Sequence, residues 1–530
     1  MKPDFDVIIV GSGPAGVSAA YPLVLSGLKV LMVDGGKAPK VALNRESYLS
    51  TRFNDAHQWK WMIGQNYYAL KNNNAISPKL RIPQYDYVFE EFDVINKITS
   101  SQFSVVGSLA KGGLSNAWGC GVAQLSKEEA DRFPFEYSEI DESYKRVGRR
   151  IGISGSSDDD LRGYFGVDEY SMPPIALDEL HSYLYERYLL KRKKINALSV
   201  EIGRSRVAAL SMDYGSRLAC NLSGNCLWGC SRKSLYSAVD DLDLLRGRSN
   251  FREISGLYVD EVIRDKGIGF IFGKLAEAKG SIKYSAKYIV LAAGTLASTR
   301  LILNAINLRN PVRMLSSPTA AFMISIPKKI GLQRKSGFGL GQMSYVLNLG
   351  NDINAFGSTF STTGIPVSEF LKFLPFRKRF GVDLLRVLLN SSIVGNIFLP
   401  GSLSDVRVQA LGDGSLKVAG GYKELVDQAF IQAHKKIREI YWAMGGILLP
   451  GSFSVGRPGA DIHYSGTIPM KRNPKLGESS SMGEVLGMEG VYVVDGSCLP
   501  MLSEKSHTLT IMANADRIGS GIAVRLMREG

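Results

Sequence analysis

Cysteine and histidine are scarce in this sequence, which has five of each among 530 residues. An odd cysteine count in a long chain argues against the paired framework of a small disulfide-rich protein. No run approaches the roughly 18 consecutive apolar residues of a membrane-spanning helix. The first residues, "MKPDFDVIIVGSG", lead into a glycine turn rather than a signal-peptide cleavage site. These absences predict a cytoplasmic protein. Its 530 residues are enough for two or three domains.

Positive charge is in excess, with a net charge of +14, but it is not concentrated. Lys and Arg are scattered apart from short runs such as 189–194 and 376–380. No nucleic-acid-binding module accompanies them. We therefore expect basic patches on a solvated face, a small-molecule partner and no nucleic-acid partner.

A glycine-rich turn follows the first apolar run, in "DVIIVGSGPAGVSAAYPLVLSGLKVLMVDGG". The pattern GxGxxG between a buried strand and a helix is typical of a dinucleotide site, because glycine allows a tight turn, a close pyrophosphate and close helix packing. The helix N-terminus favours phosphate. An acidic residue ending the next strand is placed to accept hydrogen bonds from a ribose. The candidate residues are Gly11, Gly13, Pro14, Ala15, Gly16, Asp34 and Gly35.

Two later stretches repeat the strand–turn–helix pattern: "AKYIVLAAGTLASTRLILNA" (286–305) and "GVYVVDGSCLPMLSEKSHTLTIMANADRIGSGIA" (490–523). With the N-terminal turn, in this order, they make the chain resemble the glucose-methanol-choline (GMC) oxidoreductases, an FAD-dependent family. The resemblance implies FAD rather than NAD. It adds a strand passing the adenine and turns contacting the flavin side of the cofactor, and the residues carried over are Val262, Ala293, Gly294, Asp495, Gly496 and Thr508.

The resemblance also implies the architecture. We expect an α/β protein, α+β overall, in which a Rossmann-type FAD-binding domain is interleaved with a substrate domain of a sheet and helices. The expected FAD-binding parts are 1–40, 96–314 and 456–530, and the substrate-binding parts are 41–95 and 315–455. Within the latter, residues 421–446 have the periodicity of one amphipathic helix that ends at a glycine pair.

The stretch "LAKGGLSNAWGCGV" (109–122) is similar to the flavin loop of the family, and most similar to that of pyranose oxidases and related sugar dehydrogenases. The resemblance implies that Gly112 and Gly113 let the backbone approach the flavin ring, with hydrogen bonds from Ser115 and Asn116. In several relatives the residue before the tryptophan is a histidine that carries the flavin covalently. Here it is Ala117. The FAD is therefore expected to be non-covalent.

Three of the five cysteines, Cys220, Cys226 and Cys230, are spaced C-x5-C-x3-C. Such a segment can hold an iron–sulfur cluster, and a similar one does so in some bacterial FAD sugar dehydrogenases. The spacing departs from theirs, however, and Ser223 stands where a further cysteine would complete the pattern. We favour a packed loop with buried thiols. A zinc site lacks an apparent fourth ligand, and no metal site is predicted.

Two histidines fall where the family has its catalytic pair. His463 lies in "GADIHYSGTIPM" and His507 lies in the loop before the last helix. The resemblance makes His463 the base, and imidazole chemistry suits the removal of a hydroxyl proton. A second imidazole can orient the same hydroxyl.

These features predict FAD-dependent oxidation of an alcohol, a sugar-like or polyol hydroxyl, by hydride transfer to flavin N5. Oxygen or an unknown partner would accept the electrons. Two alternatives stay open: a redox-neutral FAD-containing lyase, and a membrane-associated flavoprotein dehydrogenase. Residues 367–389 mix Phe and Leu with Lys and Arg and could touch a membrane surface. We favour an amphipathic helix pair packed on the substrate domain.

Acid precipitation of the purified protein should release all of its yellow cofactor into the supernatant, because Ala117 cannot form a covalent bond to the flavin. Absorbance of the two fractions measures this. Colour that stays in the pellet would show a linkage through another residue.

Overall fold

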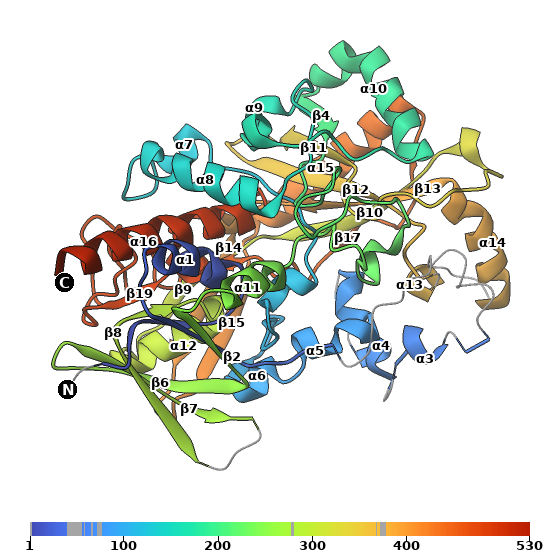
Figure 1. Ribbon diagram of the computed structural model, residues 1–530. Helices are drawn as coiled ribbons and strands as arrows, with labels where there is room; N and C mark the ends of the chain where they lie inside the picture. The colour runs from blue at the N-terminus through green and yellow to red at the C-terminus, as the bar shows by residue number, and fades with distance from the viewer. Residues whose placement is uncertain are drawn as a thin grey trace.

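The computed structural model describes residues 3–39, 56–57, 59–64, 67–71, 77–276, 280–366, 368–371 and 378–529. Its elements form two seven-stranded sheets and one five-stranded sheet. Figure 1 shows the first sheet with both chain termini at one end of the molecule and the second sheet at the other. This arrangement confirms the predicted mixed α/β fold.

The first sheet has the strand order of a Rossmann-type nucleotide fold. Strands β5, β2, β1 and β8 run parallel, so their carboxyl ends meet at one edge. Strands β7 and β6 continue the sheet in antiparallel order, and β19 pairs with β8 in parallel. The bounds are β5 (Phe251–Ser255), β2 (Val30–Asp34), β1 (Phe5–Val10), β8 (Ser281–Leu291), β7 (Ile268–Leu275), β6 (Leu257–Asp265) and β19 (Val491–Val493).

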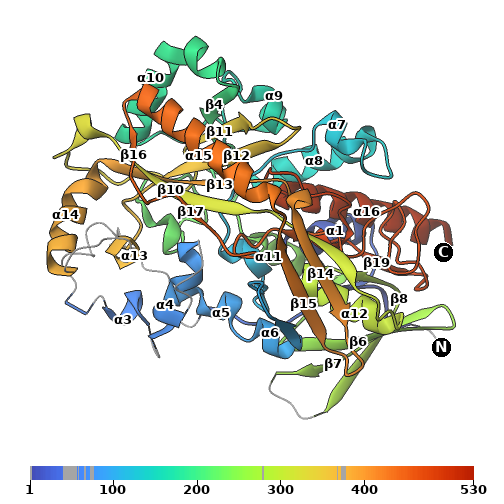
Figure 2. The same cartoon turned by 180° about the vertical axis from the view of Figure 1, so that it is seen from behind.

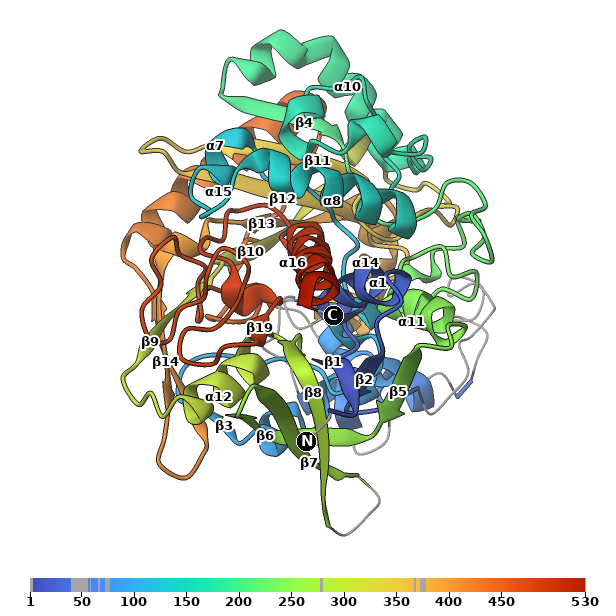
Figure 3. The same ribbon diagram turned by 60° about the vertical axis from the view of Figure 1, so that its left-hand side comes forward.

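Helices cover this sheet. The first helix, α1, and the last, α16, lie side by side although they are at opposite ends of the chain (Figure 3). Long apolar stripes on both bury the faces that meet, and α8 packs on the outer side of α16. The bounds are α1 (Pro14–Leu25), α8 (Tyr137–Ile151), α11 (Ala238–Arg246), α12 (Thr295–Ala305) and α16 (Thr508–Glu529).

The second sheet is antiparallel and has one face covered by the helices α10 and α15 (Figure 2). As predicted, α15 (Leu425–Met444) is one helix, and Gly445 ends it in the left-handed conformation. The other elements are α10 (Glu179–Asn196), β16 (Ile447–Leu448), β10 (Thr319–Ser325), β13 (Ser392–Phe398), β12 (Asn354–Ser361), β11 (Met343–Asn348), β4 (Val200–Arg204) and β17 (Ser454–Val455).

The place of β4 bears on the domain boundaries. Residues 96–314 are expected to belong to the FAD-binding part, yet β4 pairs with β11 in the second sheet and α10 packs beside α15. The sequence-based boundary missed this because β4 and β11 are far apart in the sequence, and no local sequence pattern predicts their pairing. We therefore propose that residues 179–204 belong with the substrate part, and the other boundaries stay a proposal. Residues 41–55 lie outside the described residues.

A smaller sheet connects the two large ones. It contains β18 (Tyr464–Ser465), β9 (Val312–Ser316), β14 (Ser404–Ala410), β15 (Leu416–Tyr422) and β3 (Ile98–Ser100). Strand β18 follows His463 directly, and pairing with β9 fixes its position. Several other helices are only one turn long: α3 (Trp59–Met62), α4 (Tyr68–Lys71), α5 (Asp86–Phe89), α6 (Phe92–Ile95), α7 (Lys127–Ala130) and α9 (Arg162–Phe165).

The segment 367–389 forms α13 (Ser368–Leu371) and α14 (Lys378–Asn390), which pack against each other. Residues 367 and 372–377, with Pro375, lie outside the described residues. Leu385 and Leu389 of α14 pack on Met323 of the second sheet. Within the described part of the chain, no helix is long and apolar enough to cross a membrane.

A fully buried ion-pair cluster holds the loops around β4. The guanidinium of Arg206 lies 2.8 Å from Asp159 Oδ2 and 3.0 Å from Asp168 Oδ1, and its side chain has 0% exposure. Loss of the cation would leave the Asp159 carboxylate, whose side chain is 1% exposed, with no positive charge beside it and with the backbone N–H groups of Leu161 and Arg204 as its donors. Breaking a buried pair in this way is costly.

Arg206→Ala should therefore destabilise the fold by about 3–5 kcal/mol. Thermal unfolding followed by circular dichroism would show a large fall of the midpoint. The control is Arg192→Ala, because Arg192 pairs with Asp160 while its own side chain is 56% exposed. An equal effect of the two substitutions would contradict the burial argument.

Candidate active site

One cavity of about 1020 Å³ runs through the molecule from the glycine turn after β1 to the second sheet. Its wall includes Gly11, Gly13, Pro14, Ala15, Asp34, Gly35, Gly113, Ser115, Ala117, Ala293, Gly294, Asp495, Gly496 and Thr508, all of them predicted from the sequence, together with His463 and His507. Residues from the two ends of the chain and from its middle therefore share one site.

The glycine turn is built as the motif requires. A Cβ on Gly16 would lie 1.9 Å from the carbonyl oxygen of Gly11, so only glycine lets α1 pack this closely. Gly13 faces Gly113 of the 109–122 loop with backbone on both sides. No side chain caps the N-terminus of α1, so its free N–H groups are available to phosphate oxygens.

Asp34 ends β2 at the cavity wall. Its Oδ1 accepts a hydrogen bond from the backbone N–H of Gly36 at 2.8 Å, and its Oδ2 accepts one from the hydroxyl of Ser12. Burial raises the pKa of Asp34, and the Ser12 hydrogen bond opposes that shift. The carboxyl group is thus held at the carboxyl end of the sheet, where a ribose is expected to bind.

The 109–122 loop is held by its own side chains. The Ser115 hydroxyl donates to the carbonyl of Gly112 at 2.5 Å and accepts from the N–H of Ala238 at 2.9 Å. The side-chain amide of Asn116 donates to the carbonyls of Lys111 and Gly113. In this structure these groups therefore shape the loop, and Asn116 and Gly112 do not line the cavity.

Val262 is also placed away from the cavity. It is 2% exposed and packs in the hydrophobic core, while Val259 on the same strand, β6, lines the cavity. A bulge between Val259 and Glu261 shifts the register of β6 against β7. Because Val259 lines the cavity and Val262 does not, Val259 is the better candidate for an adenine contact.

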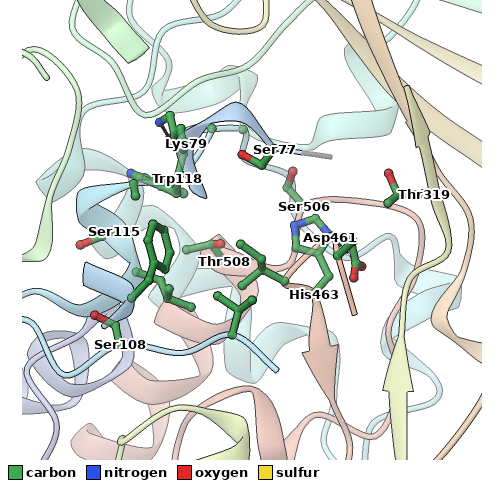
Figure 4. A pocket seen from close by; sticks show the side chains of 18 of the residues that line it. Ser77, Lys79, Ser108, Ser115, Trp118, Thr319, Asp461, His463, Ser506 and Thr508 are labelled. Atoms are coloured by element: carbon green, nitrogen blue, oxygen red, sulfur yellow. Dashed lines mark hydrogen bonds and ion pairs between the residues drawn. The ribbon is translucent and has the colours of Figure 1, made fainter. Parts of the chain in front are cut away.

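The two histidines come together. The ring centroids of His463 and His507 are 4.8 Å apart, and the rings are nearly perpendicular at 83°. Phe398 of β13 packs on the other side of His463, with centroids 4.9 Å apart. Figure 4 shows His463 beside Asp461 and Ser506, across the pocket from Trp118 and Lys79. The imidazole pair thus has an aromatic ring on one side and the polar side chains of Asp461 and Ser506 close by.

Burial keeps this pair neutral. Desolvation lowers the pKa of His463 to about 4 and that of His507 well below its ordinary value, where the neighbouring His463 adds to the effect. From the sequence alone, both imidazoles are expected to have a pKa near neutrality. In the structure, desolvation lowers the pKa of both. Both rings therefore stand ready as proton acceptors at neutral pH.

Three features of the site are absent from the sequence-based prediction. Asp461 places a buried carboxyl beside His463, and Lys79 buries its ammonium in the cavity wall, where it donates to the carbonyl of Trp118. Arg81 and Glu369 pair across the same wall. Each depends on segments distant in sequence, except Asp461, whose spacing of two residues from His463 could have marked it.

The far end of the cavity is apolar. Thr319 and Phe398 are register partners near His463, and Met323 and Val394 are partners four residues further along the same strands. At about 3.3 Å per residue, this end lies about 13 Å from the histidine end. Phe370, Leu385 and Leu449 pack with Met323 and also line the cavity.

The cysteine segment contributes Gly224 and Leu227 to the cavity wall, but none of its cysteines lines the cavity. Cys220, Cys226 and Cys230 are free, and Cys226 accepts a hydrogen bond from the N–H of Gly339 at 3.3 Å. Burial raises the pKa of Cys226 to about 12. In the ranges that the structure describes, no group of three or more His, Cys, Asp or Glu is arranged to hold a metal ion.

Comparison with known proteins agrees with this geometry. A family model described as GMC oxidoreductase, C-terminal part, matches residues 429–515, the stretch that includes both histidines. No curated protein matches the chain. Among solved structures, the fold is similar to that of pyridoxine 4-oxidase from Mesorbium loti, with a TM-score of 0.60 over 99% of both chains at 15% identity.

The family implies FAD, and the uncapped helix N-terminus, Asp34 and the continuous cavity fit that cofactor. Residues 429–515, which carry the histidine pair, are thus similar to the C-terminal part of the GMC oxidoreductases, and the chain as a whole shares the fold of the solved structure.

Proposed function

We propose that this protein oxidises an alcohol with FAD, taking the hydroxyl proton on His463. The observation that carries the proposal is the pair of neutral, half-buried imidazoles, with ring centroids 4.8 Å apart, in the wall of a cavity that continues to the dinucleotide turn. A substrate hydroxyl that approaches both rings from the cavity can be deprotonated while its carbon faces the cofactor end.

FAD would be held by the first turn of α1, by Asp34 and by the backbone around Gly294 and Gly496, all of which line the cavity. When bound, FAD accepts the hydride that leaves the alcohol carbon. Ala117 leaves this attachment non-covalent. The side chains of the protein bind, orient and move the proton.

His463 is the base in this proposal because it is neutral and faces the cavity. It takes the proton from the hydroxyl as the C–H bond breaks. Loss of the proton and the hydride converts the alcohol to a carbonyl compound. His507 forms one hydrogen bond with the same hydroxyl group and fixes its orientation.

The substrate in this proposal is a sugar-like or polyol alcohol that carries an apolar substituent. The resemblance of the 109–122 loop supports the first part. The second part rests on the apolar end of the cavity, about 13 Å from the histidines by strand rise, at Met323, Val394 and Leu385. An alkyl or aryl group there would bury apolar surface.

An anaerobic panel tests this function. Free sugars, polyols and matched series of alkyl and aryl glycosides would be mixed with the FAD-loaded protein, and flavin bleaching followed by absorbance. We expect reduction, faster with the apolar glycosides. A flavin that stays oxidised while a substrate is consumed would instead favour the lyase alternative, and reoxidation with and without oxygen separates oxidase from dehydrogenase.

Asp34→Ala should weaken FAD binding by about 1–3 kcal/mol, because a buried charged acceptor for the ribose is lost. Fluorescence titration of the apoprotein measures the dissociation constant. Ser255→Ala is the matched control, since it removes a donor to Asp34 at 3.3 Å but keeps the carboxyl group. Equal affinity in wild type and Asp34→Ala would mean that Asp34 only shapes the turn.

His463→Ala should fold and retain FAD, while flavin reduction by substrate slows by roughly 10²–10⁴, the usual contribution of a positioned general base. His507→Ala should lose less, because orientation of a hydroxyl is a smaller contribution. The double variant should be little slower than His463→Ala, since residues that act together are not additive. Stopped-flow absorbance gives the rates, and near-wild-type reduction in His463→Ala would refute the assignment.

A further inference from the structure

Asp461 has a carboxyl group that the proposed function does not yet use. Its side chain has 0% exposure, and Oδ1 faces the hydroxyl of Ser316 at 3.4 Å. Oδ2 has no hydrogen-bond partner among the described residues and lies 4.0 Å from Nδ1 of His463. That nitrogen is also buried and without a described partner.

Two unsatisfied polar atoms that face each other inside a protein need an explanation, because each costs free energy when left unpaired. A distance of 4.0 Å is too long for a hydrogen bond. Catalytic hydrogen bonds are often long before substrate binds and shorten in the complex. A small rotation of either side chain would pair these atoms with each other.

We propose that Asp461 is a positioning residue for His463: its free oxygen accepts a hydrogen bond from Nδ1–H and so leaves the lone pair on Nε2, the atom that takes the hydroxyl proton. This inference rests on the proposed function only for the last clause. A histidine whose second nitrogen is held by a carboxyl group has one tautomer and one ring orientation.

The surroundings leave these two residues as the groups that change charge. Tyr422 and Tyr464 lie close enough to Asp461 to interact with it, but burial raises the pKa of both phenols, so they stay neutral. His507 stays neutral because its pKa is lowered. Arg457, on the cavity wall, is exposed to solvent.

A dependence on pH follows. Desolvation raises the pKa of Asp461 well above its ordinary value, so the carboxyl group is neutral at low pH and ionises as the pH rises through that raised pKa. The carboxylate then favours a proton on His463 and makes it a stronger base. Flavin reduction should accelerate across this titration, and a neutral residue at 461 should remove the step.

Imidazole nitrogen NMR tests the tautomer without any substrate. Because the chain has only five histidines, ¹⁵N-histidine labelling gives few signals, and a His463→Gln spectrum assigns the one of interest. We expect a single Nδ1–H tautomer for His463 in the FAD-loaded wild type, and a mixture in Asp461→Ala. An Nε2–H tautomer in the wild type, or an unchanged signal in Asp461→Ala, would overturn the proposal.

The kinetic arm compares Asp461→Asn, which keeps the shape and removes the charge, with Ser317→Ala, which removes a buried hydroxyl that has no described partner. Asp461→Asn should slow flavin reduction by about 10- to 100-fold, as for other histidines that lose the partner orienting them, and should lose the pH step. Ser317→Ala should keep both. A wild-type profile in Asp461→Asn, with full FAD content, counts against the proposal.

The two hypotheses fail differently. If no alcohol reduces the wild-type flavin, the proposed function fails, while the NMR result still decides whether Asp461 sets the tautomer of His463. If alcohols reduce the flavin and the tautomer does not depend on Asp461, this inference alone fails.

Discussion

Hydrogen bonds of Asp495 and of Gly496, the residue after it, hold three segments of the active site together. Its Oδ2 accepts from the N–H of Gly294 and the hydroxyl of Ser298, and its Oδ1 accepts from the N–H and hydroxyl of Ser497. The backbone that follows then accepts from Gly466, just after His463. Because Asp495 is only 3% exposed, these donors must stabilise it. The carboxyl group thus joins the turn after β8 to the turn after β19, and the Gly496 carbonyl joins the latter to the His463 segment.

Desolvation sets the chemistry that the positioned residues can perform. The same exclusion of water that disfavours charge on Asp461 also lowers the pKa of His463 to about 4 and keeps the ring unprotonated. A base that has lost its solvent needs another group to stabilise the proton it accepts. In this structure the nearest candidate is the carboxyl of Asp461, at 4.0 Å from Nδ1.

Much of the site follows from local sequence. The turn at Gly11–Gly16 is dictated by backbone geometry, because a Cβ at Gly16 would collide with the chain it packs on. Parallel strands then bring the turns after β1, β2 and β8 to one edge, so residues predicted separately share one cavity. The long helices α15 and α16 were equally predictable, since their apolar periodicity extends over many turns.

The sequence by itself thus determined the fold class, the dinucleotide turn and the identity of the two histidines, because each depends on short-range pattern or on motifs shared with a family. Tertiary structure decided the rest. Strand pairing placed β4 in the second sheet, and packing around β6 buried Val262 in the core while Val259 reached the cavity. The side chain of Asn116 donates hydrogen bonds to backbone carbonyls of its own loop. Burial sets the protonation state of the two histidines, and contacts between distant segments set the hydrogen-bond partners of the site residues. Neither burial nor such contacts can be read from a local stretch of sequence.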